Sequence, residues 1–396
     1  MCNTFSVGSL IKLARMVVVS TVIALVLILV NATLAVGHEL RPAVADVQIG
    51  QDQVELQIEL ALEALVAKID VSEIDDTDNA PNAARYDELR AMEPAALEEQ
   101  LRADWDELSG NFLIAAGDEP ATNLTLTEVN IPEVGDVAIV RESKLTLTAT
   151  LPQNGENVTV GWTNNNGPLV IRQIDAGEDA YAALLDGGQL SVALPRTGYA
   201  SEGAFTVFTR FIVQGFEHII PKGADHIVFV LGLFFFSLKM RPLLVQVTSF
   251  TVAHTVTLAL AALGFVTISP SIVEPLIAAS IVFVAVENIL RPQLGVWRTA
   301  VVFVFGLLHG LGFASVLGEL GGGQANFVAR LIGFNIGVEI GQLAVIAVAF
   351  LLVGLTMGSQ PWYRARVAIP ASLIIALIGV HWFMDRVFDL GFLPVL

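Results

Sequence analysis

Residues 243–265 read LLVQVTSFTVAHTVTLALAALGF, an apolar run without Asp, Glu, Lys or Arg. At a rise of about 1.5 Å per residue, such a run is long enough to cross the hydrocarbon core of a bilayer, which is about 30 Å thick. The run therefore predicts a membrane-spanning helix. A polar residue near its middle, His254, is costly in that place and is a candidate for function.

Five further apolar runs lie on either side and, with the first, predict an all-α six-helix membrane bundle over residues 224–396. They are 224–238, 272–290, 299–317, 327–356 and 367–384. Basic residues occur in alternate connections, at Lys239 and Arg241, Arg291 and Arg298, and Arg364 and Arg366. The positive-inside rule places these connections in the cytoplasm and the C-terminus outside. We expect a multi-pass protein of the bacterial cytoplasmic (inner) membrane.

The N-terminus carries its own targeting signal. Lys12 and Arg15 precede an apolar stretch, residues 16–30, and small residues follow at 35–37. This pattern predicts a signal peptide over residues 1–37, with an uncleaved N-terminal anchor as the alternative. Either way, the next segment is expected outside the cytoplasm.

Residues 38–204 hold most of the acidity of the chain, with 31 Asp and Glu against 9 Lys and Arg, in a protein of net charge −18. Such a domain repels nucleic acid and attracts cations. Alternating apolar and polar residues predict a β-rich, sandwich-like domain with a helical insert at 94–108. The predicted strands are 44–49, 54–60, 124–129, 144–151, 158–163 and 189–194. Residues 205–223 read as an amphipathic, interfacial lead-in to the bundle.

Candidate metal ligands are limited to nitrogen and oxygen donors, because the single cysteine is Cys2, within the predicted signal peptide. By the same rise per residue, His254 lies about 18 Å and His309 about 16 Å from the cytoplasmic ends of their spans, and Glu339 lies about 18 Å from its outer end. All three are therefore predicted near the middle of the bilayer.

The ends of the bundle add further candidates. Pro221 can begin a helix, so Asp225 and His226 are expected in its first turns at the outer mouth, with Asp225 orienting a neighbouring imidazole. Glu287 lies near the cytoplasmic end of the run 272–290. Together these residues predict a path from the mouth to the cytoplasm. The complete candidate set is Asp225, His226, His254, His309, Glu339, His218, Asn335 and Glu287.

Glycines suggest how the spans pack. In the fifth run, Asn335, Glu339 and Gln342 share one helical face, and Gly333, Gly337 and Gly341 form a small-residue stripe roughly opposite. In the fourth run, Gly306 and Gly310 on either side of His309 permit close approach of another helix. We expect that approach to bring His309 towards Glu339.

Four separated segments resemble the HupE/UreJ family: 215–233, 246–258 (QVTSFTVAHTVTL), 305–314 (FGLLHGLGFA) and 333–343 (GFNIGVEIGQL). The start of the mature chain, HELRP at 38–42, is similar to the branch with a periplasmic N-terminal domain. The resemblance implies Asp225, His226 and His309 as metal-handling residues. Six residues rather than five separate His218 from Asp225, and a second His after His309 is missing, so His254 and Glu339 are expected to supply the remaining ligands.

The resemblance implies a secondary permease for nickel or cobalt, with zinc a further candidate. We expect a lipid bilayer and a divalent cation as partners, no nucleic acid, no tightly bound cofactor and no enzymatic activity. A homo-oligomer or a periplasmic partner is left open. Two alternatives are an intramembrane metal-dependent hydrolase, which would use the same side chains to activate water, and a non-transporting receptor or assembly factor.

Overall fold

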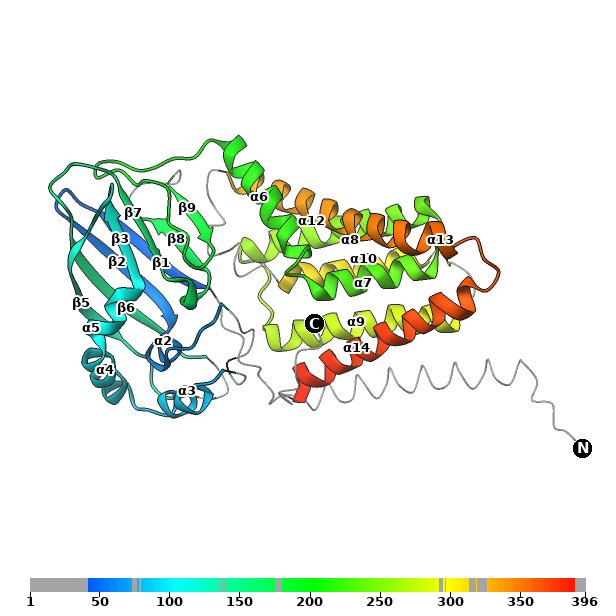
Figure 1. Cartoon of the computed structure of the whole chain (residues 1–396), viewed down its shortest axis with the longest axis horizontal. Coiled ribbons are helices and arrows are strands. Elements are labelled where there is room, and N and C mark those ends of the chain that lie inside the picture. The colour runs from blue at the N-terminus through cyan, green and yellow to red at the C-terminus, as the bar shows by residue number, and fades with distance from the viewer. Residues whose placement is uncertain are drawn as a thin grey trace, which may run out of the picture.

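The computed structural model describes residues 42–388 apart from 73–76, 78–79, 136, 138–139, 175–179, 292–294, 296, 313–317 and 319–325. A β-rich part comes first and a helical part follows, and the two lie end to end (Figure 1). The predicted signal peptide (1–37) and His38 lie outside the described residues.

Two sheets form the β-rich part. The larger has the order β5-β6-β2-β1-β8-β9, and all its neighbours are antiparallel except β1 and β8. The smaller has the order β4-β3-β7. The strand bounds are β1 Ala43–Ile49, β2 Gln53–Ala61, β3 Phe112–Ala116, β4 Glu119–Pro120, β5 Thr122–Asn130, β6 Glu142–Thr150, β7 Val158–Trp162, β8 Leu169–Gln173 and β9 Ala182–Leu185.

The two sheets share one hydrophobic core. In β2, Val54, Leu56 and Ile58 point inwards and are at most 1% exposed, while the polar residues between them face out. This period of two is what a half-buried strand requires. The helical insert is confirmed as α4 (Pro94–Ala103) and α5 (Trp105–Leu108), and α2 (Leu62–Ala67) and α3 (Ala83–Arg90) accompany it.

One predicted strand, 189–194, is wrong, because the segment makes only isolated bridges, between Leu194 and Val158 and between Leu190 and Gly161. Four strands were not predicted: β3, β4, β8 and β9. Leu169, Val170 and Ile171 of β8 are buried in succession, so that strand shows no alternation in the sequence.

The helical part contains α6 (Ala204–Ile219), α7 (Ala224–Phe236), α8 (Met240–Ala262), α9 (Pro270–Leu290), α10 (Trp297–Gly312), α12 (Phe327–Ala349) and α14 (Ile369–Phe388). A π-helical turn, η4 (Phe350–Gly354), and α13 (Leu355–Met357) extend α12, and η5 (Arg364–Ala368) precedes α14. Packing is pairwise: α6 lies on α12, α10 on α8, and α14 on α9.

The predicted count of six spans differs from what the described helices support. Four are long and apolar enough to cross a membrane by themselves: α8, α9, the α12–α13 unit and the η5–α14 unit. The helices α6 and α7 pass only as a pair, bent by 72°, and α10 is shorter than a full span. Pro221 lies in the break, where its missing N–H cannot continue a helix.

Residues 205–223, expected as an interfacial lead-in, belong to the bundle. The stripe of Gly333 and Gly337 on α12 lies against the backbone of α6, where an added Cβ would collide with the carbonyl oxygens of Phe208 and Ile212. Gly215 of α6 lies equally close to Phe334. The predicted close approach on both sides of His309 is also confirmed, but its partner is α8: Gly306 meets Phe250 and Gly310 meets His254.

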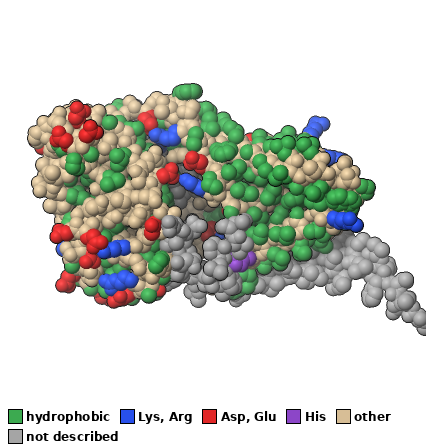
Figure 2. Space-filling view, viewed as in Figure 1, with side chains coloured by type: hydrophobic (Ala, Val, Ile, Leu, Met, Phe, Trp, Pro, Cys, Tyr) green, Lys and Arg blue, Asp and Glu red, His purple; other side chains and the backbone are tan. Residues whose placement is uncertain are grey.

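The outer surface of the bundle is apolar. Exposed side chains include Val252 and Val256 on α8 and Leu373 and Leu377 on α14. In Figure 2, hydrophobic side chains dominate the visible face of the helical part, whereas most acidic ones lie on the β-rich part. A surface of this kind suits contact with lipid.

Candidate metal centre

Four histidines from four different helices meet inside the bundle. His218 of α6, His226 of α7 and His254 of α8 form one group, in which one ligand atom of each lies within 4.8 Å of the others. Asp225, His226 and His309 of α10 form a second group by the same measure. His226 belongs to both groups, so the two together make one histidine centre.

The histidine centre is buried and lined by aromatic rings. His226, His254 and His309 are each at most 3% exposed. The ring of Phe250 lies 5.0 Å from that of His309, and the ring of Phe334 stacks at 6.3 Å on that of His254. Imidazoles in such a site have little access to water, so the nitrogens that lack a protein partner are costly unless a ligand occupies them.

Each buried histidine has one ring nitrogen held by an acceptor. Asp225 Oδ1 lies 3.0 Å from His226 Nδ1. Asn335 Oδ1 lies 3.1 Å from His254 Nδ1, and the Asn335 amide donates to the carbonyl of Leu331. Because that amide nitrogen is already committed, the Asn335 oxygen accepts and His254 Nδ1 carries the hydrogen.

Ser280 of α9 is the acceptor for a ring nitrogen of His309. Its hydroxyl donates to the carbonyl of Ile277 at 2.6 Å, so Oγ is left to accept from His309 Nε2 at 3.3 Å. The remaining ring nitrogens, His226 Nε2, His254 Nε2 and His309 Nδ1, are buried without a hydrogen-bond partner in the described part of the chain. With a hydrogen fixed on one nitrogen, each ring presents a lone pair on the other, which is the arrangement of metal-binding histidines.

This geometry differs from the predicted path first at His226. His226 was expected at the outer mouth, well separated from His254 and His309 at mid-depth. The structure places all three together, and the rings of His226 and His309 are 4.8 Å apart. The reason is the break after α6, because α7 begins next to the centre and carries His226 in its first turn.

Glu339 stands apart from both histidine groups. Its carboxylate accepts hydrogen bonds from the hydroxyls of Thr248 and Thr251 on α8. Asn335, predicted as a ligand, instead orients His254. The stripe of glycines fixes this outcome, because α12 uses it to pack on α6 and so turns the face of Asn335 and Glu339 towards α8.

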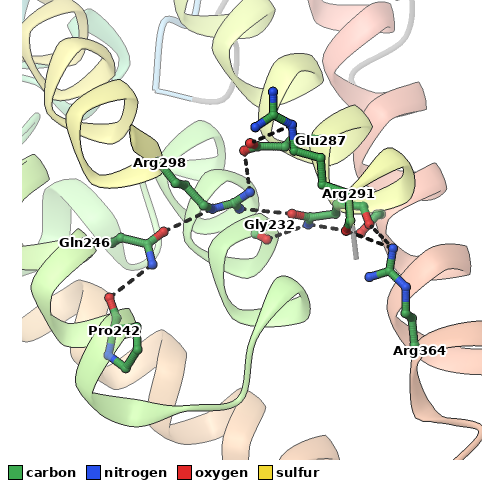
Figure 3. A network of polar contacts seen from close by, with 9 residues as sticks. Gly232, Pro242, Gln246, Glu287, Arg291, Arg298 and Arg364 are labelled. Atoms are coloured by element: carbon green, nitrogen blue, oxygen red, sulfur yellow. Dashed lines mark hydrogen bonds and ion pairs between the residues drawn. The ribbon is translucent and has the colours of Figure 1, made fainter. Parts of the chain in front are cut away.

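Glu287, also predicted on the path, belongs to a separate polar network towards the beginning of α8 (Figure 3). Its carboxylate pairs with Arg298 at 2.6 Å, and Arg298 is 1% exposed. Arg298 also donates to Gln246 and Asn288, and Asn288 donates to the carbonyl of Gly232. The network thus joins α7, α8, α9 and α10.

Sequence reasoning missed Ser280 altogether and placed His218 less securely than its neighbours. Ser280 lies in an apolar run and has no charge to draw attention. The available signal was its type, because a small hydroxyl residue inside a span commonly bonds to a neighbouring helix.

A bundle of apolar helices with an apolar exterior defines a multi-pass membrane protein, and its buried imidazoles form groups of the kind that could hold a metal ion. Residues 196–386 match the family model described as HupE / UreJ protein, and through this helical part the chain belongs to the HupE/UreJ family. The family is generally linked to nickel or cobalt transport or to urease and hydrogenase maturation. No curated protein and no solved structure matches the chain.

Proposed function

We propose that this protein is a secondary transporter for a divalent transition-metal ion of the nickel or cobalt type, and that the ion binds at the histidine centre. The observation that carries the proposal is the set of three buried lone pairs, on His226 Nε2, His254 Nε2 and His309 Nδ1. In each ring, the other nitrogen donates its hydrogen to an acceptor, which leaves this lone pair free for a metal ion.

The donor chemistry supports a borderline divalent ion. Imidazole nitrogens suit nickel, cobalt and zinc better than hard ions such as magnesium or calcium. The Asp225 carboxylate contributes a negative charge beside His226 and offsets part of the charge of a bound dication. Family membership favours nickel or cobalt within that class.

In the proposed orientation, the β-rich part faces the extracytoplasmic side, as predicted from the signal peptide and the basic connections. It touches the helical part close to the break between α6 and α7. Lys222 in the break pairs with Asp186 at 3.1 Å, and Gln214 of α6 donates to the carbonyl of Leu184. Cations attracted by the acidic surface would thereby be held near the helices that carry His218 and His226.

The test is uptake of ⁶³Ni²⁺ or ⁵⁷Co²⁺ by the full-length protein in liposomes. Wild type is expected to accumulate the ion, and His226→Ala is expected to abolish accumulation, because both histidine groups lose their shared member. His381→Asn is the matched control, since His381 lies in the bundle but in neither group. Normal uptake by His226→Ala would refute the proposed site. Absence of uptake by wild type, with stoichiometric zinc retained through purification, would favour the metal-dependent hydrolase.

A further inference from the structure

Glu339 is a carboxylate inside the α12–α13 span, and it forms no ion pair among the residues that the structure describes. An ionised carboxylate at membrane depth is expensive unless a positive charge accompanies it. By contrast, Glu274 and Glu287 in span α9 each have an arginine nearby. Glu339 is therefore a half-buried carboxylate within a span that lacks a positive partner in the described chain.

The hydrogen-bond partners of Glu339 in the described chain are two hydroxyl groups. Thr248 Oγ1 lies 2.7 Å from Glu339 Oε1, and the Thr251 hydroxyl contacts Oε2. Thr251 has a second acceptor, the carbonyl oxygen of Val247 at 3.3 Å. Its hydroxyl hydrogen can therefore turn away from the carboxylate and leave an oxygen lone pair for a cation.

A further oxygen lies on the same face of α12. Gln342 follows Glu339 by three residues, is fully buried, and neither its Oε1 nor its Nε2 has a hydrogen-bond partner in the described chain. Side chains three residues apart on a helix are neighbours. An unpartnered amide oxygen beside an unpaired carboxylate is a second, independent sign that this place accepts a ligand.

This oxygen cluster is close to the histidine centre but distinct from it. Asn335, which orients His254, precedes Glu339 by four residues, about 6 Å along the helix axis. Two cations bound close together inside a bundle repel each other strongly. Occupation of one place therefore weakens binding at the other.

We propose that Glu339, Thr248 and Thr251 form a second cation site, which takes a sodium ion and exchanges it against the divalent ion at the histidine centre. The exchange rests on the proposed transport function, whereas the sodium site itself does not. Oxygen donors with a single negative charge suit a small hard monovalent ion, and the imidazole centre suits a softer dication. Sodium binding at the second site would couple transport to a sodium gradient across the membrane.

The first experiment measures Co²⁺ affinity of the purified full-length protein by calorimetry, in sodium chloride and in choline chloride of the same ionic strength and pH. Sodium is expected to weaken Co²⁺ binding by wild type at least about fivefold, the lower end of common coupling between sites. Glu339→Gln keeps the shape of the side chain but removes its charge, so its Co²⁺ affinity is expected to be the same in sodium and in choline. The same result is expected for Thr248→Val. Thr248→Ser keeps the hydroxyl, so sodium should weaken its Co²⁺ binding as in wild type.

Thr255→Val is the matched control, because the Thr255 hydroxyl donates to the backbone carbonyl of Thr251 rather than to the carboxylate. It should respond to sodium as wild type does. Equal Co²⁺ affinity of wild type in the two salts would overturn the proposal. So would a loss of Co²⁺ binding in Glu339→Gln as severe as in His226→Ala, because Glu339 would then be a ligand of the histidine centre. A response of wild type to protons but not to sodium would overturn the sodium assignment.

A second measurement separates this proposal from the transport function. A sodium ion that binds only the folded protein raises its melting temperature. Sodium, compared with choline, should therefore stabilise wild type and Thr255→Val but not Glu339→Gln, with no divalent metal present. If sodium raises the melting temperature but the protein binds no Co²⁺, the sodium site is supported and the metal transporter is rejected. If the protein binds Co²⁺ but sodium leaves the melting temperature unchanged, the sodium site is rejected and the metal site is retained.

Discussion

Asn335 on α12 accepts a hydrogen bond from His254 on α8, with 3.1 Å between Asn335 Oδ1 and His254 Nδ1. This bond joins two helices and decides which nitrogen of a fully buried imidazole faces the histidine centre. The asparagine thus acts on the centre through the ring that it orients.

Replacement of Asn335 by Leu should weaken Co²⁺ binding by about 10–100-fold, the usual cost of losing the partner of a metal-binding histidine. Asn335→Asp keeps an acceptor at the same place and should retain more of the affinity. Calorimetric titration of the purified variants measures both effects. Wild-type affinity in Asn335→Leu would show that the ring needs no such support.

The shared position of His226 predicts a spectroscopic signature. Co²⁺ bound by several imidazoles gives visible absorption bands whose intensity depends on coordination number. His226→Ala should lose these bands, because it removes the member common to both groups. His309→Ala should change their intensity but retain some binding through His218, His226 and His254. Identical spectra from wild type and His226→Ala would place the ion elsewhere.

Close packing of α10 on α8 predicts a stability effect at Gly310. A Cβ there would collide with the Thr257 hydroxyl and the carbonyl oxygen of His254. Gly310→Ala should therefore lower the free energy of unfolding by about 1–3 kcal/mol, as overpacking does. Gly312→Ala is the control on the same helix, because among the described residues its Cβ would meet Ile277 alone, at an ordinary 3.6 Å. Thermal unfolding in detergent compares the two, and equal melting temperatures would contradict the contact.

The network of Arg298 predicts a larger effect. Arg298→Leu leaves the Glu287 carboxylate, 6% exposed, without its closest cation. Breaking a buried pair in this way should cost about 3–5 kcal/mol. The double variant Arg298→Leu/Glu287→Leu removes both charges and should recover much of that loss. If the double variant were no more stable than the single one, the pair itself would not be the cause.

Several features of this protein were open to prediction because they depend on local pattern. The run 243–265 predicted α8, and the alternation in residues 54–60 predicted β2. The glycine stripe of α12 predicted a close helix neighbour. Apolar length, period-two alternation and the absence of a side chain are properties that a sequence displays directly.

Other features depended on contacts between distant segments. Glu339 was expected near His309, yet the structure pairs it with Thr248 and Thr251. Glu287 was expected on the cation path, yet it pairs with Arg298. Helical periodicity shows which residues share a face, but it does not show which neighbour that face meets.

The sequence by itself determined a chain of apolar helices after an acidic β-rich part, with ionisable side chains at costly depths. Only the tertiary structure decided that four histidines form one centre. The physical reason is the break between α6 and α7, together with the packing of α6 on α12 and of α10 on α8. These two features bring His218, His226, His254 and His309 together from four helices. Asp225, Asn335 and Ser280 hold the rings of His226, His254 and His309, respectively.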